Sequence, residues 1–158
     1  MNASWIFFLA LCIGIVAGLR AVTAPAVVSW AARLGWLNLH GSILAFMGTS
    51  VAVVVFSLGA VGEYVNDKLP KTASRTAPPQ FIARIVMGGL SGACICASAR
   101  ASLVAGALLG AVGAVIGTLG GYQARTRLVK SLQVKDLFVA VPEDLVAIGL
   151  AFLVASLG

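Results

Sequence analysis

Charged residues are scarce in this chain. Only 10% of its 158 residues are Asp, Glu, Lys or Arg, whereas 60% are hydrophobic. A soluble globular domain carries about a quarter charged residues, so this chain has too few charges to cover a soluble surface. The composition therefore excludes an ordinary soluble domain and predicts that the lipid bilayer is the chain's main partner.

Histidine and cysteine are scarce as well, which excludes several kinds of chemistry. The single His40 stands beside Gly41 with no evident partner. Cys12, Cys94 and Cys96 lie in apolar segments without a second pair that would complete a metal site, so we expect buried apolar side chains. No phosphate loop, zinc motif or serine elbow is present. The sequence predicts no catalytic set, no metal and no cofactor, which disfavours an enzyme.

Apolar segments of membrane-spanning length recur along the chain. A spanning helix needs about 20 mostly apolar residues. The candidates are residues 4–19, 42–62, 81–99, 102–122 and 137–157. Because no Lys or Arg precedes Trp5, we interpret the first segment as a retained helix and not as a signal peptide. The sequence thus predicts an all-α polytopic membrane bundle of five to six spans, forming a single domain over residues 1–158.

Two prolines mark predicted breaks in these helices. Pro25 suits the first turn of a new helix, so the first helix should break between Arg20 and Pro25. The segment 25–39 is compatible with an interfacial helix, a half-span or a short sixth span. Pro142 precedes two carboxylates, which favours a helix start there, with residues 137–141 as a broken lead-in.

The polar stretch 63–80 is predicted to be a basic cytoplasmic loop. Its prolines break helices, and it joins halves of about residues 1–67 and 81–158. With five spans, eight cations fall on its side of the membrane and three on the other, which places the C-terminus outside. If residues 25–39 span, the N-terminus lies outside too. The two groups are Lys68, Lys71, Arg75, Arg84, Arg125, Arg127, Lys130 and Lys135, against Arg20, Arg33 and Arg100.

Glycine is abundant, with 18 residues, and much of it is periodic. Gly106, Gly110, Gly113, Gly117 and Gly120 form one stripe of a single helix. Small residues let helix backbones approach closely in lipid. The stripe predicts tight packing within one bundle, and the alternative is a dimer seam in a homo-oligomer.

Five charged residues inside apolar sequence form the candidate binding site. A charge at the bilayer centre costs roughly 2.5–3.5 kcal/mol, so we expect these side chains to face inward, toward partners or water. Candidate pairs join Arg20 or Arg125 to Glu63 or Glu143. The five residues are Arg20, Glu63, Arg125, Glu143 and Asp144.

A second group of cations is predicted to contact anionic lipid headgroups. Lys68, Lys71 and Arg75 lie in the hydroxyl-rich loop, where each cation near the membrane contributes about 1 kcal/mol of attraction. The same loop is compatible with a phosphate or other anion site. Arg84 should reach the interface by extending its side chain. No recognition helix or aromatic platform accompanies these cations, so nucleic acid is not a predicted partner.

The two halves show a weak internal similarity. Residues 60–63 resemble residues 140–143, and residues 14–20 resemble residues 117–125. Since the single helix 81–99 separates the two pairs of helices, the second pair would be inverted. Inverted repeats with broken helices and charges near the breaks are typical of transporters.

Several of these motifs together resemble a known family. They are Gly18-Leu19-Arg20 with Pro25, residues 63–70, Ser74-Arg75-Thr76 with Arg84, residues 120–125 and residues 143–149. Over nearly the whole chain they resemble the bacterial membrane-protein family called domain of unknown function 4126. The resemblance implies a small multi-pass protein of the bacterial inner membrane with no settled activity. Gln123 departs from the histidine expected in this family, which counts against a proton-handling role there.

The charges at membrane depth lead to two hypotheses of function. The first is a transporter or channel-like protein for a small, perhaps anionic, solute or lipid headgroup. Arg20 and Arg125 would then recognise charge, and Glu63, Glu143 and Asp144 would pair or bind a coupling cation. The alternative is a non-transporting scaffold or assembly factor, in which the same charges fix the register of the helices. The sequence specifies neither the substrate nor the oligomeric state.

Overall fold

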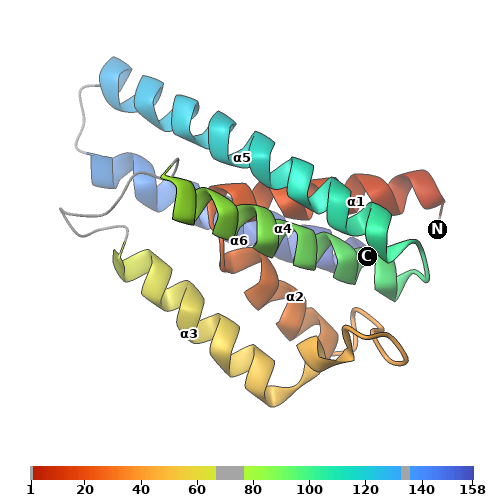
Figure 1. Ribbon diagram of the computed structural model, residues 1–158. Coiled ribbons are helices and arrows are strands. Elements are labelled where there is room, and N and C mark those ends of the chain that lie inside the picture. The colour runs from red at the N-terminus through yellow and green to blue at the C-terminus, as the bar shows by residue number, and fades with distance from the viewer. Residues whose placement is uncertain (1, 67–76, 133–135) are drawn as a thin grey trace.

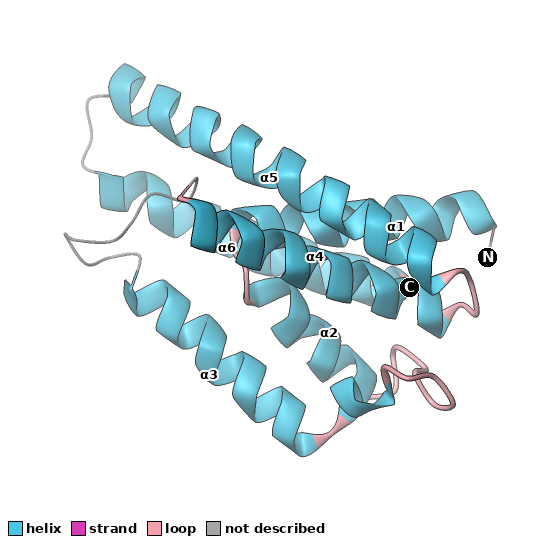
Figure 2. Ribbon diagram, in the orientation of Figure 1, coloured by secondary structure: helices cyan, strands magenta, loops and turns pink. Residues whose placement is uncertain are grey.

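The computed structural model describes residues 2–66, 77–132 and 136–158, and these residues form helices and loops without a strand (Figure 2). The all-α prediction is confirmed for this part of the chain. In order, the helices are α1 (Ala3–Leu19), α2 (Thr23–Arg33), the short 3-10 helix η1 (Ala45–Gly48), α3 (Ser50–Asn66), α4 (Pro78–Ser98), α5 (Leu103–Leu132) and α6 (Asp136–Leu157).

Among the residues that the structure describes, two helices are long and apolar enough to cross a membrane, namely α4 and residues Leu103–Ser131 of α5. The apolar helices α1 and α3 are shorter, with 17 residues each. The 11 residues of α2 reach only about 16 Å at 1.5 Å per residue, about half of a bilayer core of ~30 Å. This length excludes a full span for residues 25–39, and the bundle of five to six spans stays a prediction.

Glycine lets α4 and α5 pack backbone against backbone. A Cβ atom added to Gly88 would collide with Ala114 and the carbonyl of Gly110, and one added to Gly92 would collide with Gly106. The two helices are therefore antiparallel, because the earlier glycine of α4 meets the later glycine of α5. No side chain other than hydrogen fits at these crossings.

The same glycine stripe of α5 also packs against α1. A Cβ at Gly14 would collide with Gly110, and one at Gly18 would collide with Gly117. The order of these contacts makes α1 and α5 parallel. The stripe predicted from the sequence is thus used for packing within one bundle, except at Gly120, where a Cβ would meet no atom within 4 Å.

The predicted inverted repeat is wrong, because it requires α1 and α5 to be antiparallel. The reason is α2, which turns the chain back toward the end where α1 began before α3 starts (Figure 1). Both termini consequently lie at one end of the bundle, on the right in Figure 1. The ends of α3 and α5 and the starts of α4 and α6 lie at the other end.

The last helix, α6, continues through Pro142. The predicted break at this proline is therefore wrong, whereas the break before Pro25 is confirmed. Proline lacks an N–H, so it removes one hydrogen bond from the helix interior, and helices in apolar surroundings tolerate this loss through local adjustment. The continuous helix carries Ala147, Ala151 and Val154 into the core.

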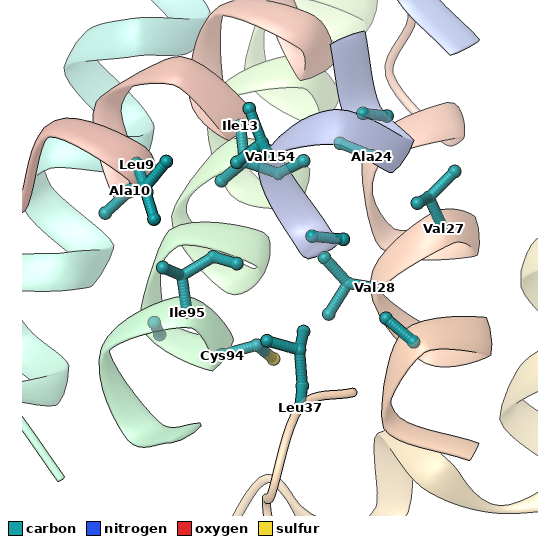
Figure 3. Close-up of a cluster of buried hydrophobic side chains, with 14 of the residues drawn as sticks. Leu9, Ala10, Ile13, Ala24, Val27, Val28, Leu37, Cys94, Ile95 and Val154 are labelled. Carbon is teal, nitrogen blue, oxygen red and sulfur yellow. The ribbon is translucent and has the colours of Figure 1, made fainter. Parts of the chain in front are cut away.

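A hydrophobic core joins four helices at the end of the bundle that holds both termini (Figure 3). Its largest fully buried members include Leu9 and Ile13 of α1, Val28 of α2 and Ile95 of α4. Leu37, in the loop after α2, closes the core from the side. The three cysteines are free, and Cys94 and Cys96 are buried, as expected for apolar side chains. This core fixes α2 against α1 and so fixes the position of the break between them.

Candidate functional site

The site is built around the break between α1 and α2. Helix α1 ends at Leu19, Arg20 is extended (φ −141°, ψ 109°) and α2 begins at Thr23. Gly18 packs on Thr118, which lies near the middle of the 30-residue α5. The break therefore lies inside the bundle. A helix end leaves backbone groups without intrahelical partners, and here those groups need partners from other side chains.

The start of α2 is capped by the carboxylate of Glu63 from α3. The N–H of Ala21 donates to Oε1 at 2.8 Å, and the N–H of Val22 donates to Oε2 at 2.9 Å. A carboxylate at this position also interacts favourably with the positive end of the helix dipole. Next to it, the hydroxyls of Thr23 and Tyr64 lie 2.9 Å apart.

The end of α1 is capped by the guanidinium of Arg84 from α4. Its Nη1 donates to the carbonyls of Gly18 at 2.6 Å and Leu19 at 2.9 Å. The hydroxyl of Thr118 lies 3.2 Å from the same Gly18 carbonyl. A cation at a helix C-terminus is favoured by the dipole. Nη2 of Arg84 also lies 3.6 Å from Oε1 of Glu63, so the two capping side chains touch.

This position corrects the headgroup contact predicted for Arg84. The side chain is only 2% exposed and does not extend to an interface. The carbonyls at the end of α1 lie within hydrogen-bond distance of it. In an apolar core these carbonyls would otherwise lack partners. Arg84 belongs to the same cluster as Glu63.

Arg20 is fully buried at the centre of the break. Its Nε donates to Oδ1 of Asp144 at 2.7 Å, and its Nη2 forms an ion pair with the same oxygen. The guanidinium carbon lies 5.0 Å from the ring centroid of Tyr64, which is within reach of a cation–π interaction. The pair Arg20–Asp144 was not among the predicted pairs, although both residues were in the predicted site.

Of the remaining predicted site residues, one lies further along α5 and the others are outside the described residues. Arg125 is half-buried on α5, seven residues beyond Thr118 and so about 10 Å along the helix. The side chain of Glu143 is outside the described part. The predicted headgroup contacts Lys68, Lys71 and Arg75 also lie outside it, so their roles stay predictions.

Three hydroxyl residues of the site were missed by the sequence prediction: Thr23, Tyr64 and Thr118. Two of them had a usable signal. Tyr64 directly follows a predicted site residue, and Thr118 is a polar residue inside the glycine stripe, which must face a packed seam. Thr23 could be placed only once the start of α2 was known.

Chemically, the cluster can hold anions. Two backbone N–H groups and two guanidinium groups converge on two carboxylates. Among the residues whose placement is described, no three His, Cys, Asp or Glu side chains come close enough together to hold a metal ion. The arrangement holds the carboxylates of Glu63 and Asp144 through hydrogen bonds and cations.

The fold and the site define an all-helical protein whose first helix is broken inside the bundle beside a buried ionic cluster. The chain belongs to the family described as Domain of unknown function (DUF4126), whose model matches residues 7–157. This confirms the resemblance over nearly the whole chain. No curated protein and no solved structure matches the chain. Since the family description names no activity, the function has to be argued from the site.

Proposed function

We propose that this protein is an integral membrane protein that transports a small anionic solute, with the cluster at the helix break as its recognition site. The membrane location is supported by apolar stripes on the outer faces of the helices. On α5, Val104, Leu108, Val112 and Ile116 are all at least half exposed and follow at every fourth residue. Soluble proteins rarely expose contiguous apolar patches of more than a few hundred Å².

The helix directions complete the proposed topology. The ends of α3 and α5 and the starts of α4 and α6 lie together (Figure 1), and the end of α5 carries the described cations Arg127 and Lys130. That side is cytoplasmic by the excess of Lys and Arg. Both termini then lie on the outer side of the membrane, which we take to be the bacterial inner membrane. Helix α2 returns through part of the bilayer as a half-span.

The observation that carries the proposal is the carboxylate held at the start of α2. In transporters with broken helices, the exposed N–H groups of a half-helix hold the anionic group of the substrate. Here the N–H groups of Ala21 and Val22 hold such a group, but it belongs to Glu63. The site therefore has the size and the donors for a carboxylate or a similar small anion.

In the proposed mechanism, Glu63 and the substrate compete for one place. When Glu63 leaves the start of α2, an incoming anion accepts hydrogen bonds from the N–H groups of Ala21 and Val22 and forms an ion pair with Arg84. The Arg20–Asp144 pair stays closed and keeps the break in place. Helix α3, which carries Glu63, packs mainly against α2 and lies away from α4 along most of its length (Figure 1), so it is the element that can move.

A scaffold or assembly factor is the second candidate, and one observation favours it. Each charged side chain described in the cluster is already bonded within the chain: Arg20 to Asp144, Arg84 to two carbonyls and Glu63 to two N–H groups. In a scaffold, buried pairs of this kind would have the single role of fixing helix register. Under this hypothesis Glu63 never leaves α2.

Anion flux in proteoliposomes separates the two candidates. Vesicles containing the full-length protein are loaded with potassium chloride, formate, acetate or phosphate, and efflux is started with a potassium ionophore. Transport predicts flux of at least one of these anions above that of empty vesicles. Glu63→Gln keeps the shape of the side chain but removes its charge, so it should compete less with the anion and raise that flux about tenfold. A tenfold change corresponds to about 1.4 kcal/mol of binding free energy.

Glu63→Asp is the matched control, because it keeps the competing charge and should change the flux less. If neither the wild type nor Glu63→Gln passes any of the four anions, transport of small anions is refuted and the scaffold remains. If flux occurs but Glu63→Gln does not raise it, the competition mechanism is wrong.

A further inference from the structure

A second polar site lies away from the cluster, at one end of the bundle. A pocket of about 530 Å³ opens between the end of α2, the following loop, η1 and the start of α3. Ser50 lines it, and Glu63 lies thirteen residues further along α3, which is about 20 Å. The loop after α2 lies beside the C-terminus, since a Cβ added to Gly158 would lie 3.3 Å from Cδ2 of Leu37. The pocket is therefore on the end that carries both termini.

The pocket is lined by positive charge and hydroxyl groups. Arg33 and His40 are its ionisable residues, and no carboxylate lines it. Thr49 and Ser50 add hydroxyls, of which that of Thr49 donates to the carbonyl of Phe46 at 2.7 Å. Within the part of the chain that the structure describes, the Arg33 guanidinium has no hydrogen bond or ion pair. It is available for a ligand.

Exposed aromatic residues beside this pocket are typical of a membrane surface. Trp30 and Trp36 flank Arg33 in sequence and are 43% and 49% exposed. Tryptophan is enriched at the boundary between hydrocarbon and headgroups. Ile43 and Phe46, on the loop and η1 beside the pocket, are also exposed and suit contact with acyl chains. The pocket then lies at the depth of the phosphate groups.

Charge distribution argues that Arg33 has a specific role. The proposed topology puts this end outside, where the excess of cations found in cytoplasmic loops is absent. Arg33 and Arg100 are the cations placed at this end by the described residues. A guanidinium forms paired hydrogen bonds with phosphate more readily than any other side chain.

We propose that this pocket binds the phosphate group of an anionic ligand, carried either by a phospholipid headgroup or as free phosphate. Arg33 pairs with two phosphate oxygens, and His40 and the Ser50 hydroxyl supply further donors. The proposal rests on the membrane location and not on transport, so it holds for a scaffold as well.

The test compares ligands and variants of the full-length protein in detergent. Native mass spectrometry measures binding of phosphatidylglycerol against phosphatidylcholine, and calorimetry measures binding of inorganic phosphate. Arg33→Asn should weaken binding of the preferred ligand about tenfold. Arg100→Asn is the matched control, because this exposed arginine has a positive φ of 56°, which asparagine tolerates, and it does not line the pocket.

Preference for phosphatidylglycerol that Arg33→Asn abolishes identifies a lipid, and binding of phosphate without that preference identifies a soluble ligand. Either result supports the proposal if Arg100→Asn binds like the wild type. The proposal is overturned if the wild type binds none of the probes, if Arg33→Asn binds as tightly as the wild type, or if Arg100→Asn loses as much. Because Arg33 is exposed, its variant should keep the wild-type thermal stability, which separates lost binding from misfolding.

Discussion

Replacing Asp144 alone should be far more damaging than replacing Asp144 and Arg20 together. Asp144→Leu leaves the Arg20 side chain buried, with 0% of its surface exposed, and removes the carboxylate that its guanidinium contacts in the wild type. Arg20→Met likewise leaves the carboxylate of Asp144, which is 11% exposed, without the guanidinium that it contacts in the wild type. The double variant replaces the ion pair with two apolar side chains.

The magnitudes follow from the burial of the pair. Removing one partner of a buried ion pair costs about 3–5 kcal/mol of unfolding free energy, whereas replacing both with apolar residues ranges from neutral to about 1–4 kcal/mol stabilising. We expect about 3 kcal/mol for Asp144→Leu, the lower end of that range, because the Tyr64 ring remains beside the guanidinium. The double variant should lie within about 1 kcal/mol of the wild type.

Reversible unfolding in mixed micelles measures these differences. The fraction of denaturing detergent is raised, and unfolding is followed by the fluorescence of the three tryptophans. Arg127→Met is the control, since Arg127 is an exposed cation on α5 and its loss should change stability by no more than about 0.5 kcal/mol.

Two outcomes would refute the reasoning. A cost of less than about 1 kcal/mol for Asp144→Leu would show that Arg20 does not depend on this partner. A double variant whose loss equals the sum of the two single losses would show that the side chains do not interact, because interacting residues give non-additive changes.

Two further predictions test the packing and the topology. Gly110→Ala should lower the free energy of unfolding by about 3 kcal/mol or prevent folding, since its Cβ would collide with the carbonyl of Gly88. Gly120→Ala has open space around its Cβ and should raise the free energy of unfolding by about 0.5–1 kcal/mol. The same unfolding assay measures both changes. Cysteines introduced as Asn2→Cys and Ser156→Cys should react with an impermeant maleimide from one side of the membrane, and Arg127→Cys from the other. Labelling of the two terminal positions from opposite sides would contradict the return of the chain through α2.

The sequence allowed the break at Arg20 to be predicted because its cause is local. Pro25 fixes its own backbone geometry and lacks an N–H, so it favours the first turn of a helix wherever the rest of the chain lies. The same reasoning failed at Pro142, which sits inside α6. There the loss of one hydrogen bond is small compared with the packing of a helix that buries one face, with Ala147, Ala151 and Val154, in the core. Only the tertiary structure shows that packing.

The members of the site were easier to predict than their partners. A charge in an apolar segment is costly, so Arg20, Glu63 and Asp144 could be identified residue by residue. Their pairing depends on the direction of each helix, and α2 reverses that direction although it is too short to count as a span. The inverted repeat was wrong for this reason, because it assumed that each apolar segment crosses once. The headgroup contact of Arg84 was wrong because α1 ends inside the bundle, where its carbonyls accept from this side chain.

We take the break itself as support for the proposed binding site. A continuous first helix would satisfy the carbonyls of Gly18 and Leu19 and the N–H groups of Ala21 and Val22 without help, and in an apolar core each such group left alone costs several kcal/mol. The chain instead breaks the helix at that depth and then brings Arg84 and Glu63 from two other helices to satisfy these groups. Under the scaffold hypothesis, this arrangement serves only to turn the chain back through α2. Under the proposed function, it also supplies backbone donors inside the bundle, where an anion can replace Glu63.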